Sequence, residues 1–187
     1  MLKSCWDCIV GYDLIRDGTR AEEPYSVQLN GNVSRAPPWP RPQLKNEKMF
    51  LLPKKLESQD KIVVNCEIMD QPGILRIGLV TGSNSPDYSN LACQLEMYFP
   101  PQFSDKLAIT IVRNGDPTLV YEDSAVNFYE DINFSMAFRM RDNGWMDVGI
   151  GESHLTSLQL MHDIESIRYL TVNGDINKVS SLDFQFG

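Results

Sequence analysis

The stretch from Leu91 to Phe99 decides the fold class, and it reads Leu-Ala-Cys-Gln-Leu-Glu-Met-Tyr-Phe. A large apolar residue or a cysteine stands at every second position, with polar, small or amphipathic residues between them. This period of two is typical of a β-strand with one face in a core, because successive side chains of a strand point to opposite faces. A helix would repeat its apolar residues every three or four positions instead.

The same alternation recurs through the second part of the chain. We predict further strands at 62–68, 74–81, 107–112, 134–141, 145–150, 155–160, 167–172 and 179–186, with a short one near Tyr121. Turn-forming runs such as Gln71-Pro-Gly73, Asn114-Gly-Asp-Pro117 and Asp142-Asn-Gly144 separate these segments. About ten short strands with regular turns and no helical periodicity predict an all-β, antiparallel two-sheet sandwich.

Proline divides the chain into two parts. Residues 1–48 contain five prolines: Pro24, Pro37, Pro38, Pro40 and Pro42. The proline-rich run from 37 to 42 cannot form a helix or a central strand. We therefore predict an extended N-terminal arm over 1–48 and a sandwich domain over 49–187. Trp6, Tyr25 and Trp39 are the side chains with which the arm would pack, either on its own domain or on a partner chain.

Charge follows the same division. The arm carries seven basic and six acidic residues, which leaves ten basic and nineteen acidic residues, a net charge of −9, in 49–187. An acidic domain with a pI near 4.7 is a poor ligand for phosphate backbones, so we expect no nucleic-acid partner. The longest apolar runs span only a few residues, which predicts no membrane insertion.

The first residues predict no secretory signal, because Asp7 occurs before any apolar run. We therefore expect a protein that is cytoplasmic or is exported without a signal peptide. Four cysteines are too few for a disulfide framework, so we interpret them as reduced thiols, although Cys5 and Cys8 form a CxxC whose role stays open. A zinc site would need two further ligands at short spacing, and none is present.

Catalytic motifs are missing from the sequence. There is no GxSxG, Walker A, GxGxxG or HExxH pattern. His154 and His162 could be combined with Glu152 and Asp163, but a separation of eight residues across a turn is not ligand spacing. We predict no enzyme activity, no metal site and no cofactor.

The outward positions of the strands suggest a ligand face. Gln94, Glu96 and Tyr98 point away from the core, and Thr110 and Asn114 extend this polar face from the next strand. Planar hydrogen-bonding groups and an aromatic ring together suit a sugar, whose hydroxyls need partners and whose C–H face packs on rings. An ordinary solvated sheet face is the competing interpretation.

From residue 49 to 186 the sequence resembles the galectins, all-β lectins that bind β-galactosides. The runs that carry the resemblance are Phe50–Pro53, Asp60–Val64, Leu75–Gly82, Tyr98–Phe103, Ile111–Asn114, Val148–Leu155 and Ile167–Ile176. Their order and spacing follow the family pattern. The resemblance implies a sandwich of two sheets in a jelly-roll arrangement and no cofactor.

At the sugar-contacting positions of the family, most residues differ. The resemblance places Tyr98 at the family's His, Pro100 at its Asn and Gln102 at its Arg, while Asn114 is kept. In the next segment, Leu119 stands at the stacking Trp and Ser124 at an Arg, while Glu122 is kept. Tyr121 could replace the ring if the loop shifted.

We therefore expect a non-catalytic binding module whose β-galactoside site is degraded and which serves protein–protein contact, with the arm as one contact surface. The alternative is a lectin with altered glycan specificity. Its candidate glycan face would consist of Tyr98, Gln102, Asn114, Tyr121 and Glu122. The sequence leaves open the partner, the oligomeric state, and whether residues 1–48 bind in cis or in trans.

Overall fold

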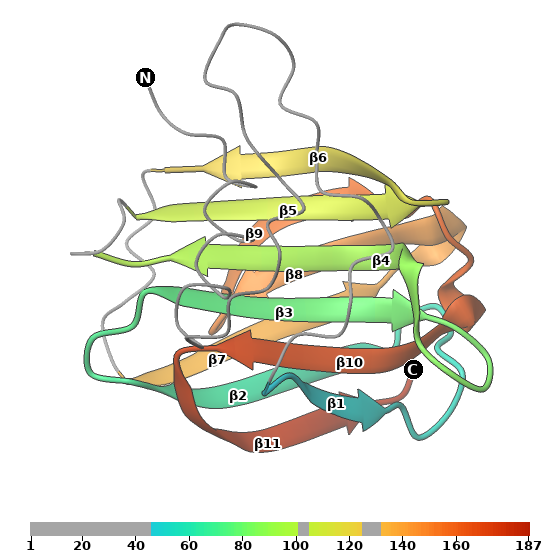
Figure 1. Ribbon diagram of the computed structural model, residues 1–187. Coiled ribbons are helices and arrows are strands. Elements are labelled where there is room, and N and C mark those ends of the chain that lie inside the picture. The colour runs from blue at the N-terminus through green and yellow to red at the C-terminus, as the bar shows by residue number, and fades with distance from the viewer. Residues whose placement is uncertain (1–45, 101–104, 125–131) are drawn as a thin grey trace, which may run out of the picture.

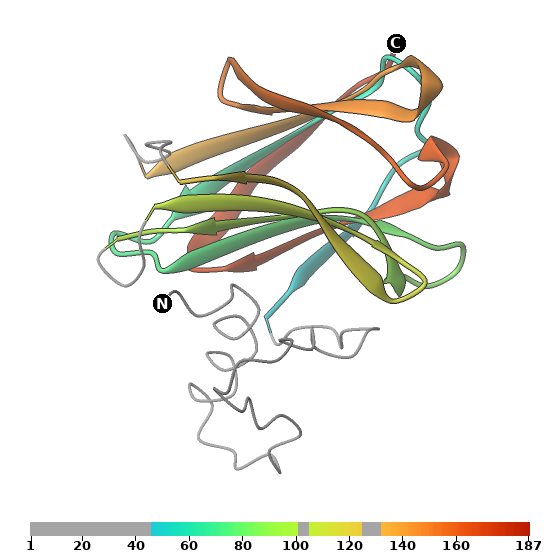
Figure 2. The same cartoon turned by 90° about the horizontal axis from the view of Figure 1, so that it is seen from above.

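A computed structural model describes residues 46–100, 105–124 and 132–187. Two antiparallel β-sheets face each other as layers, which Figure 2 shows most clearly. The prediction of an all-β two-sheet sandwich is therefore confirmed. The predicted arm, together with Cys5, Cys8, Trp6, Tyr25 and Trp39, lies outside the described residues. The sandwich begins with a strand at Lys48, one residue before the predicted boundary.

The larger sheet has six strands in the order β1-β10-β3-β4-β5-β6 (Figure 1). Their bounds are Lys48–Leu51 for β1, Ile167–Gly174 for β10, Ile74–Thr81 for β3, Asp87–Tyr98 for β4, Lys106–Arg113 for β5 and Asp116–Asp123 for β6. Strand β1 has only four residues and no clear period of two, so the alternation of the sequence does not predict it.

The smaller sheet has five strands in the order β11-β2-β7-β8-β9. Their bounds are Ile176–Gln185 for β11, Lys61–Ile68 for β2, Asn133–Met140 for β7, Trp145–Ile150 for β8 and Ser153–Gln159 for β9. Two short 3-10 turns, Asp142–Gly144 and Ile164–Ser166, are the only helical segments in the described part of the chain. No helix in that part is long and apolar enough to cross a membrane.

The core lies between the two sheets and consists of the apolar members of the alternating strands. Strand β2 is the clearest case, because every second residue from Ile62 to Ile68 is buried. Leu75, Ile77 and Leu79 of β3 meet these residues from the opposite sheet. Burial of apolar surface on this scale is the main force that holds such a sandwich together.

Candidate functional site

The outer face of the six-stranded sheet, the face turned away from the five-stranded sheet, carries a row of polar residues. The strand register aligns Asn173 of β10 with Arg76 of β3, Arg76 with Glu96 of β4, Glu96 with Ala108 of β5, and Ala108 with Glu122 of β6. Neighbours in such a row have Cβ atoms about 5 Å apart, so their side chains can interact. The row crosses five strands, β10, β3, β4, β5 and β6.

Glu96 is the centre of a polar network on this face. Its Oε1 accepts a hydrogen bond from Gln94 Nε2 at 2.7 Å, and its Oε2 accepts one from Tyr98 Oη at 3.0 Å. Arg76 Nε lies 3.4 Å from Glu96 Oε1, and Arg76 Nη1 donates to Asn173 Oδ1 at 3.4 Å. We name these five residues the Glu96 cluster.

The Glu96 cluster is buried, which is unusual for charged groups on the outside of a sandwich. The exposed fraction is 3% for Glu96, 4% for Arg76 and 3% for Tyr98. Each residue of the cluster also takes part in at least one further polar, electrostatic or ring interaction. No strand or 3-10 turn of the described residues lies on this side of the sheet.

An apolar patch adjoins the cluster on the same face. It consists of Val80, Tyr88, Leu91, Val112 and Tyr169, and we name it the outer apolar cluster. The sequence pattern predicts Leu91 on the core side together with Cys93, and that prediction is wrong. A register shift in the pairing of β4 with β5 between Leu91 and Gln94 changes the alternation, because a β-bulge adds an unpaired residue to one strand.

The predicted glycan residues divide between two ends of the sheet. Tyr98 and Glu122 lie at one end, where Tyr98 pairs with Lys106 and Lys106 Nζ forms an ion pair with Glu122 Oε2 at 2.9 Å. Asn114 lies at the opposite end, in the turn between β5 and β6, where its backbone N–H donates to Asn90 Oδ1 at 2.9 Å. Gln102 lies outside the described residues.

Tyr121 does not share the outer face with Tyr98 and Glu122. It pairs with the core residue Ile109 and packs against the core, because it is the strand neighbour of Glu122 and successive side chains point to opposite faces of a sheet. Burial raises the pKa of its hydroxyl, and the carboxylate of Asp123, which accepts a hydrogen bond from Tyr121 Oη at 3.1 Å, raises it further. Leu119 points outward in its place and is 53% exposed.

The loops at the Asn114 end of the sandwich enclose two adjoining hollows of about 970 and 600 Å³. Lys55, Arg113, His162, Asp163 and Glu165 contribute to both. His162 Nε2 donates to the carbonyl oxygen of Val112 at 2.7 Å, which joins the loop after β9 to the end of β5. The charges of this wall are mixed: Lys55 and Glu165 form an ion pair at 3.4 Å.

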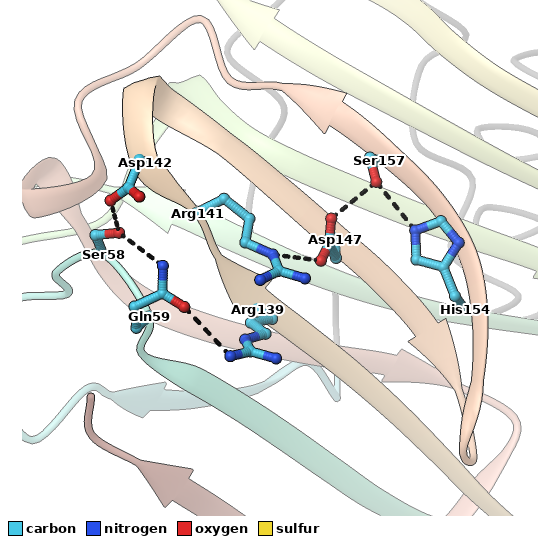
Figure 3. Close-up of polar contacts among 8 residues, drawn as sticks. All are labelled: Ser58, Gln59, Arg139, Arg141, Asp142, Asp147, His154 and Ser157. Atoms are coloured by element: carbon cyan, nitrogen blue, oxygen red, sulfur yellow. Dashed lines mark hydrogen bonds and ion pairs between the residues drawn. The ribbon is translucent and has the colours of Figure 1, made fainter.

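His154 lies on the outer face of the five-stranded sheet, away from His162, in the polar group of Figure 3. Ser157 Oγ donates to Asp147 Oδ1 at 2.8 Å, and His154 Nε2 contacts Ser157 Oγ at 3.0 Å. Among residues 46–100, 105–124 and 132–187, no three His, Cys, Asp or Glu side chains form a group that could hold a metal ion.

Asp147 is the acceptor at the centre of that group. It also pairs with Arg141, whose Nε lies 2.6 Å from Asp147 Oδ2. Burial raises the pKa of the Asp147 carboxyl, but the Ser157 hydroxyl and the Arg141 guanidinium outweigh burial and lower the pKa overall. Beside this group, Ser58 contacts Asp142, and Gln59 accepts a hydrogen bond from Arg139 at 3.2 Å (Figure 3).

The arrangement of the two sheets is that of the galectins. Sheep galectin-11, solved in complex with glycerol, matches with a TM-score of 0.60 and 12% identity over 76% of this chain and 99% of the other. A variant of human galectin-16 matches with a TM-score of 0.62 and 13% identity over 77% of this chain and 98% of the other. The chain therefore has a galectin-like fold.

Sequence comparison adds nothing to this similarity. No family model matches the sequence, and no curated protein matches it significantly. At 12–13% identity the structural similarity establishes the fold alone.

Proposed function

We propose that this protein is a non-catalytic binding module of galectin-like fold whose β-galactoside site is degraded and which serves protein–protein contact. The observation that carries the proposal is that Glu96 is already hydrogen-bonded within its own sheet. Its two carboxylate oxygens accept hydrogen bonds from Gln94 and Tyr98 and face Arg76, all within the same sheet. A carboxylate whose two oxygens already accept hydrogen bonds within its own sheet has less capacity left for sugar hydroxyls.

The residues at the family's contact positions support the same conclusion. Leu119 offers an exposed apolar side chain at the position of the stacking Trp, but it has no aromatic face for a sugar ring. Pro100 has no side-chain hydrogen-bonding group. A hydrogen bond to a ligand contributes about 0.5–1.5 kcal/mol, and more when charged, so the loss of several contacts would remove a weak monosaccharide affinity.

The group of Ser157, His154 and Asp147 does not have the order of a hydrolytic triad. In a hydrolytic triad the serine donates to the histidine, and the histidine donates to the carboxylate. Here Ser157 donates directly to Asp147, so the histidine is a neighbour of the serine oxygen and not the acceptor of its proton. This order favours a structural hydrogen-bond network on the sheet surface.

A lectin with altered glycan specificity is the second candidate. Glu122 supports it, because this retained carboxylate is exposed at the rim of the sheet beside Lys106. The division of the other candidates weakens it, because Asn114 lies at the far end of the strands and Tyr121 packs against the core.

A binding assay with deglycosylated proteins separates the two candidates. The intact chain is immobilised, and capture of proteins from an extract is compared before and after enzymatic removal of glycans, with free lactose as competitor. The proposal predicts capture that survives deglycosylation and resists lactose. Two results together would contradict it. One is capture that is lost on deglycosylation. The other is binding to a glycan array that is reduced by Glu122→Gln or Asn114→Ala but not by the surface control Asp183→Asn.

A further inference from the structure

The outer face of the five-stranded sheet, the face turned away from the six-stranded sheet, carries three cations beside an exposed aromatic ring. Lys61 of β2 lies directly opposite Arg139 of β7. Arg141 is two residues further along the chain, and Figure 3 shows its side chain on the same face as that of Arg139. The backbone N–H of Arg141 donates to the carbonyl oxygen of Trp145 at 2.7 Å, so Trp145 lies beside it. We name these four residues the Trp145 patch.

Two cations of the patch face each other without a carboxylate partner. Neither Lys61 nor Arg139 forms an ion pair with an Asp or Glu among the described residues, and Arg139 donates instead to the neutral amide oxygen of Gln59 at 3.2 Å. Like charges directly opposite each other in a sheet are destabilising. They stand out here, because residues 49–187 contain ten basic and nineteen acidic residues.

The carboxylates near the patch do not neutralise this pair. Each already has partners of its own: Arg141 and Ser157 for Asp147, Asn65 and Ser181 for Asp183, and Ser58 for Asp142. Arg141 is therefore paired within the sheet, whereas Lys61 and Arg139 together offer a place for a carboxylate from outside the domain.

Trp145 is the one tryptophan in the part of the chain that the structure describes, and its side chain is 43% exposed. Its indole N–H has no hydrogen-bond partner among the described residues. Tryptophan and arginine are enriched among the residues that carry most of the binding energy of protein interfaces. No residue of the patch lines either of the two hollows at the Asn114 end. Small ligands prefer concave sites, so this position favours a protein segment over a sugar.

We propose that the Trp145 patch is the protein-contact surface of this domain and that its partner is an acidic segment with an apolar side chain. A carboxylate of the partner lies between Lys61 and Arg139, and the apolar side chain packs on Trp145. The two rows of the patch are about 7 Å apart along the strands, which is the spacing of side chains i and i+2 in an extended chain. This inference rests on the proposed function, because it names the surface and the partner of that contact.

A titration of the isotope-labelled intact chain with a synthetic peptide tests the proposal. The peptide consists of repeated Glu-Ser-Phe-Ser units, so that its glutamate and phenylalanine side chains share one face when the chain is extended. A peptide with lysine in place of glutamate is the control probe. We expect saturable shifts of the amide signals of Arg139, Arg141 and Trp145 with the acidic peptide and none with the lysine peptide. Added salt should weaken the binding, because it screens exposed charges.

Three single variants locate the contact. Lys61→Gln, Arg139→Gln and Trp145→Ala should each weaken binding of the acidic peptide at least fivefold, because each removes one group that the peptide contacts. Lys178→Gln is the matched control, because Lys178 lies on the same sheet but is already paired with Glu67 at 2.9 Å. Since Lys61 and Arg139 repel each other, Lys61→Gln should leave the urea midpoint of unfolding unchanged or raise it.

Four results would overturn the proposal. The first is the absence of saturable shifts with the acidic peptide, and the second is shifts that map to another surface. The third is equal affinity of the parent and all four variants for that peptide. The fourth is tighter binding of a heparin-derived oligosaccharide than of the acidic peptide at the same residues, which would assign the patch to anionic glycans.

The capture assay distinguishes failure of this inference from failure of the proposed function. Capture that survives deglycosylation and is equal for the parent and Trp145→Ala would overturn the assignment of the patch and keep the protein-contact function. Capture that is lost on deglycosylation would count against the function itself and therefore against the patch as its surface.

Discussion

Glu96 is the residue on which the outer face depends. It joins Arg76, Gln94 and Tyr98, and all four side chains are buried. Glu96→Gln would leave the Arg76 guanidinium in a buried position without this carboxylate, and breaking such a pair costs about 3 kcal/mol. We expect the free energy of unfolding to fall by about that amount in urea titrations monitored by circular dichroism.

Glu122→Gln is the matched control for this prediction. Its ion pair with Lys106 has similar chemistry but lies at the rim, where Glu122 is substantially exposed. Exposed ion pairs contribute less than about 1 kcal/mol, so the free energy of unfolding of this variant should be close to that of the parent. Equal losses in the two variants would show that the Glu96 cluster is not a buried network.

Cys66 and Cys93 are predicted to be inert thiols. Burial raises the pKa of Cys66 to about 11 and that of Cys93 to about 12. Because the thiolate is the reactive form, neither should react with a disulfide reagent at pH 8 until the protein unfolds. Peptide mapping after labelling in native buffer and in denaturant measures this, and labelling of Cys93 in the native state would be the contrary result.

At the scale of elements, Asp60 fixes the loop between β1 and β2. It accepts backbone hydrogen bonds from Glu57 and Gly187 and pairs with Lys54 at 3.2 Å. Burial raises the pKa of its carboxyl, but the hydrogen bonds and the ammonium together lower it below the ordinary 3.8. A lowered folded-state pKa means that ionised Asp60 stabilises the fold above about pH 4 and that this contribution disappears as pH falls through the folded pKa.

Asp60→Asn should therefore lower stability most at neutral pH, by about 2 kcal/mol, which is typical for charge-assisted hydrogen bonds. The difference between the parent and the variant should shrink when urea unfolding is repeated at pH values below 4. A difference that is constant from pH 7 to pH 3 would argue against an ionised Asp60 as the cause.

The turn between β10 and β11 depends on Gly174. Its φ is +117°, and an added Cβ would lie 2.2 Å from the carbonyl oxygen of Ile74. Gly174→Ala combines a forbidden backbone conformation with a clash against main chain, and we expect a loss of more than about 2 kcal/mol. Gly151→Ala is the control, because Gly151 has φ +57° with open space around it and should cost about 1 kcal/mol.

The sequence predicts the positions of the strands better than it predicts to which face of the sheet the residues near their ends point. The alternation in β2 gives the correct buried residues from Ile62 to Ile68, because that strand pairs with β7 without a register shift. In β4 the same reasoning misplaces Leu91, which lies next to a register shift. A β-bulge has no signature in the apolar pattern, since the extra residue is visible only through the pairing of both strands.

Site geometry was less predictable for the same reason. Tyr98 and Asn114 are both outward candidates in the sequence, but their distance depends on the length of the hairpin that joins β4 to β5. The observed register pairs Tyr98 with Lys106 and places Asn114 beside Asn90, at the opposite end. A different register between β4 and β5 would give every residue of these strands a different cross-strand neighbour. A single sequence does not determine that register.

At the scale of the whole molecule, an acidic two-sheet sandwich of galectin-like fold carries a buried polar network on the face where the resemblance implies a sugar site. The central claim is our proposal that this network leaves no working β-galactoside site on that face. Its residues bind one another, and Leu119 and Ser124 are the residues that the sequence resemblance places at the family's stacking and basic positions.

An NMR titration of the isotope-labelled intact chain with lactose tests that claim most directly, because it reports binding residue by residue. We predict no saturable shift of the amide signals of Gln94, Glu96 or Thr110 up to about 10 mM lactose, a concentration at which even a ligand with a Kd of about 1 mM, or −4 kcal/mol, would be bound. Saturable shifts confined to β4, β5 and β6 with a Kd below about 1 mM would contradict the account.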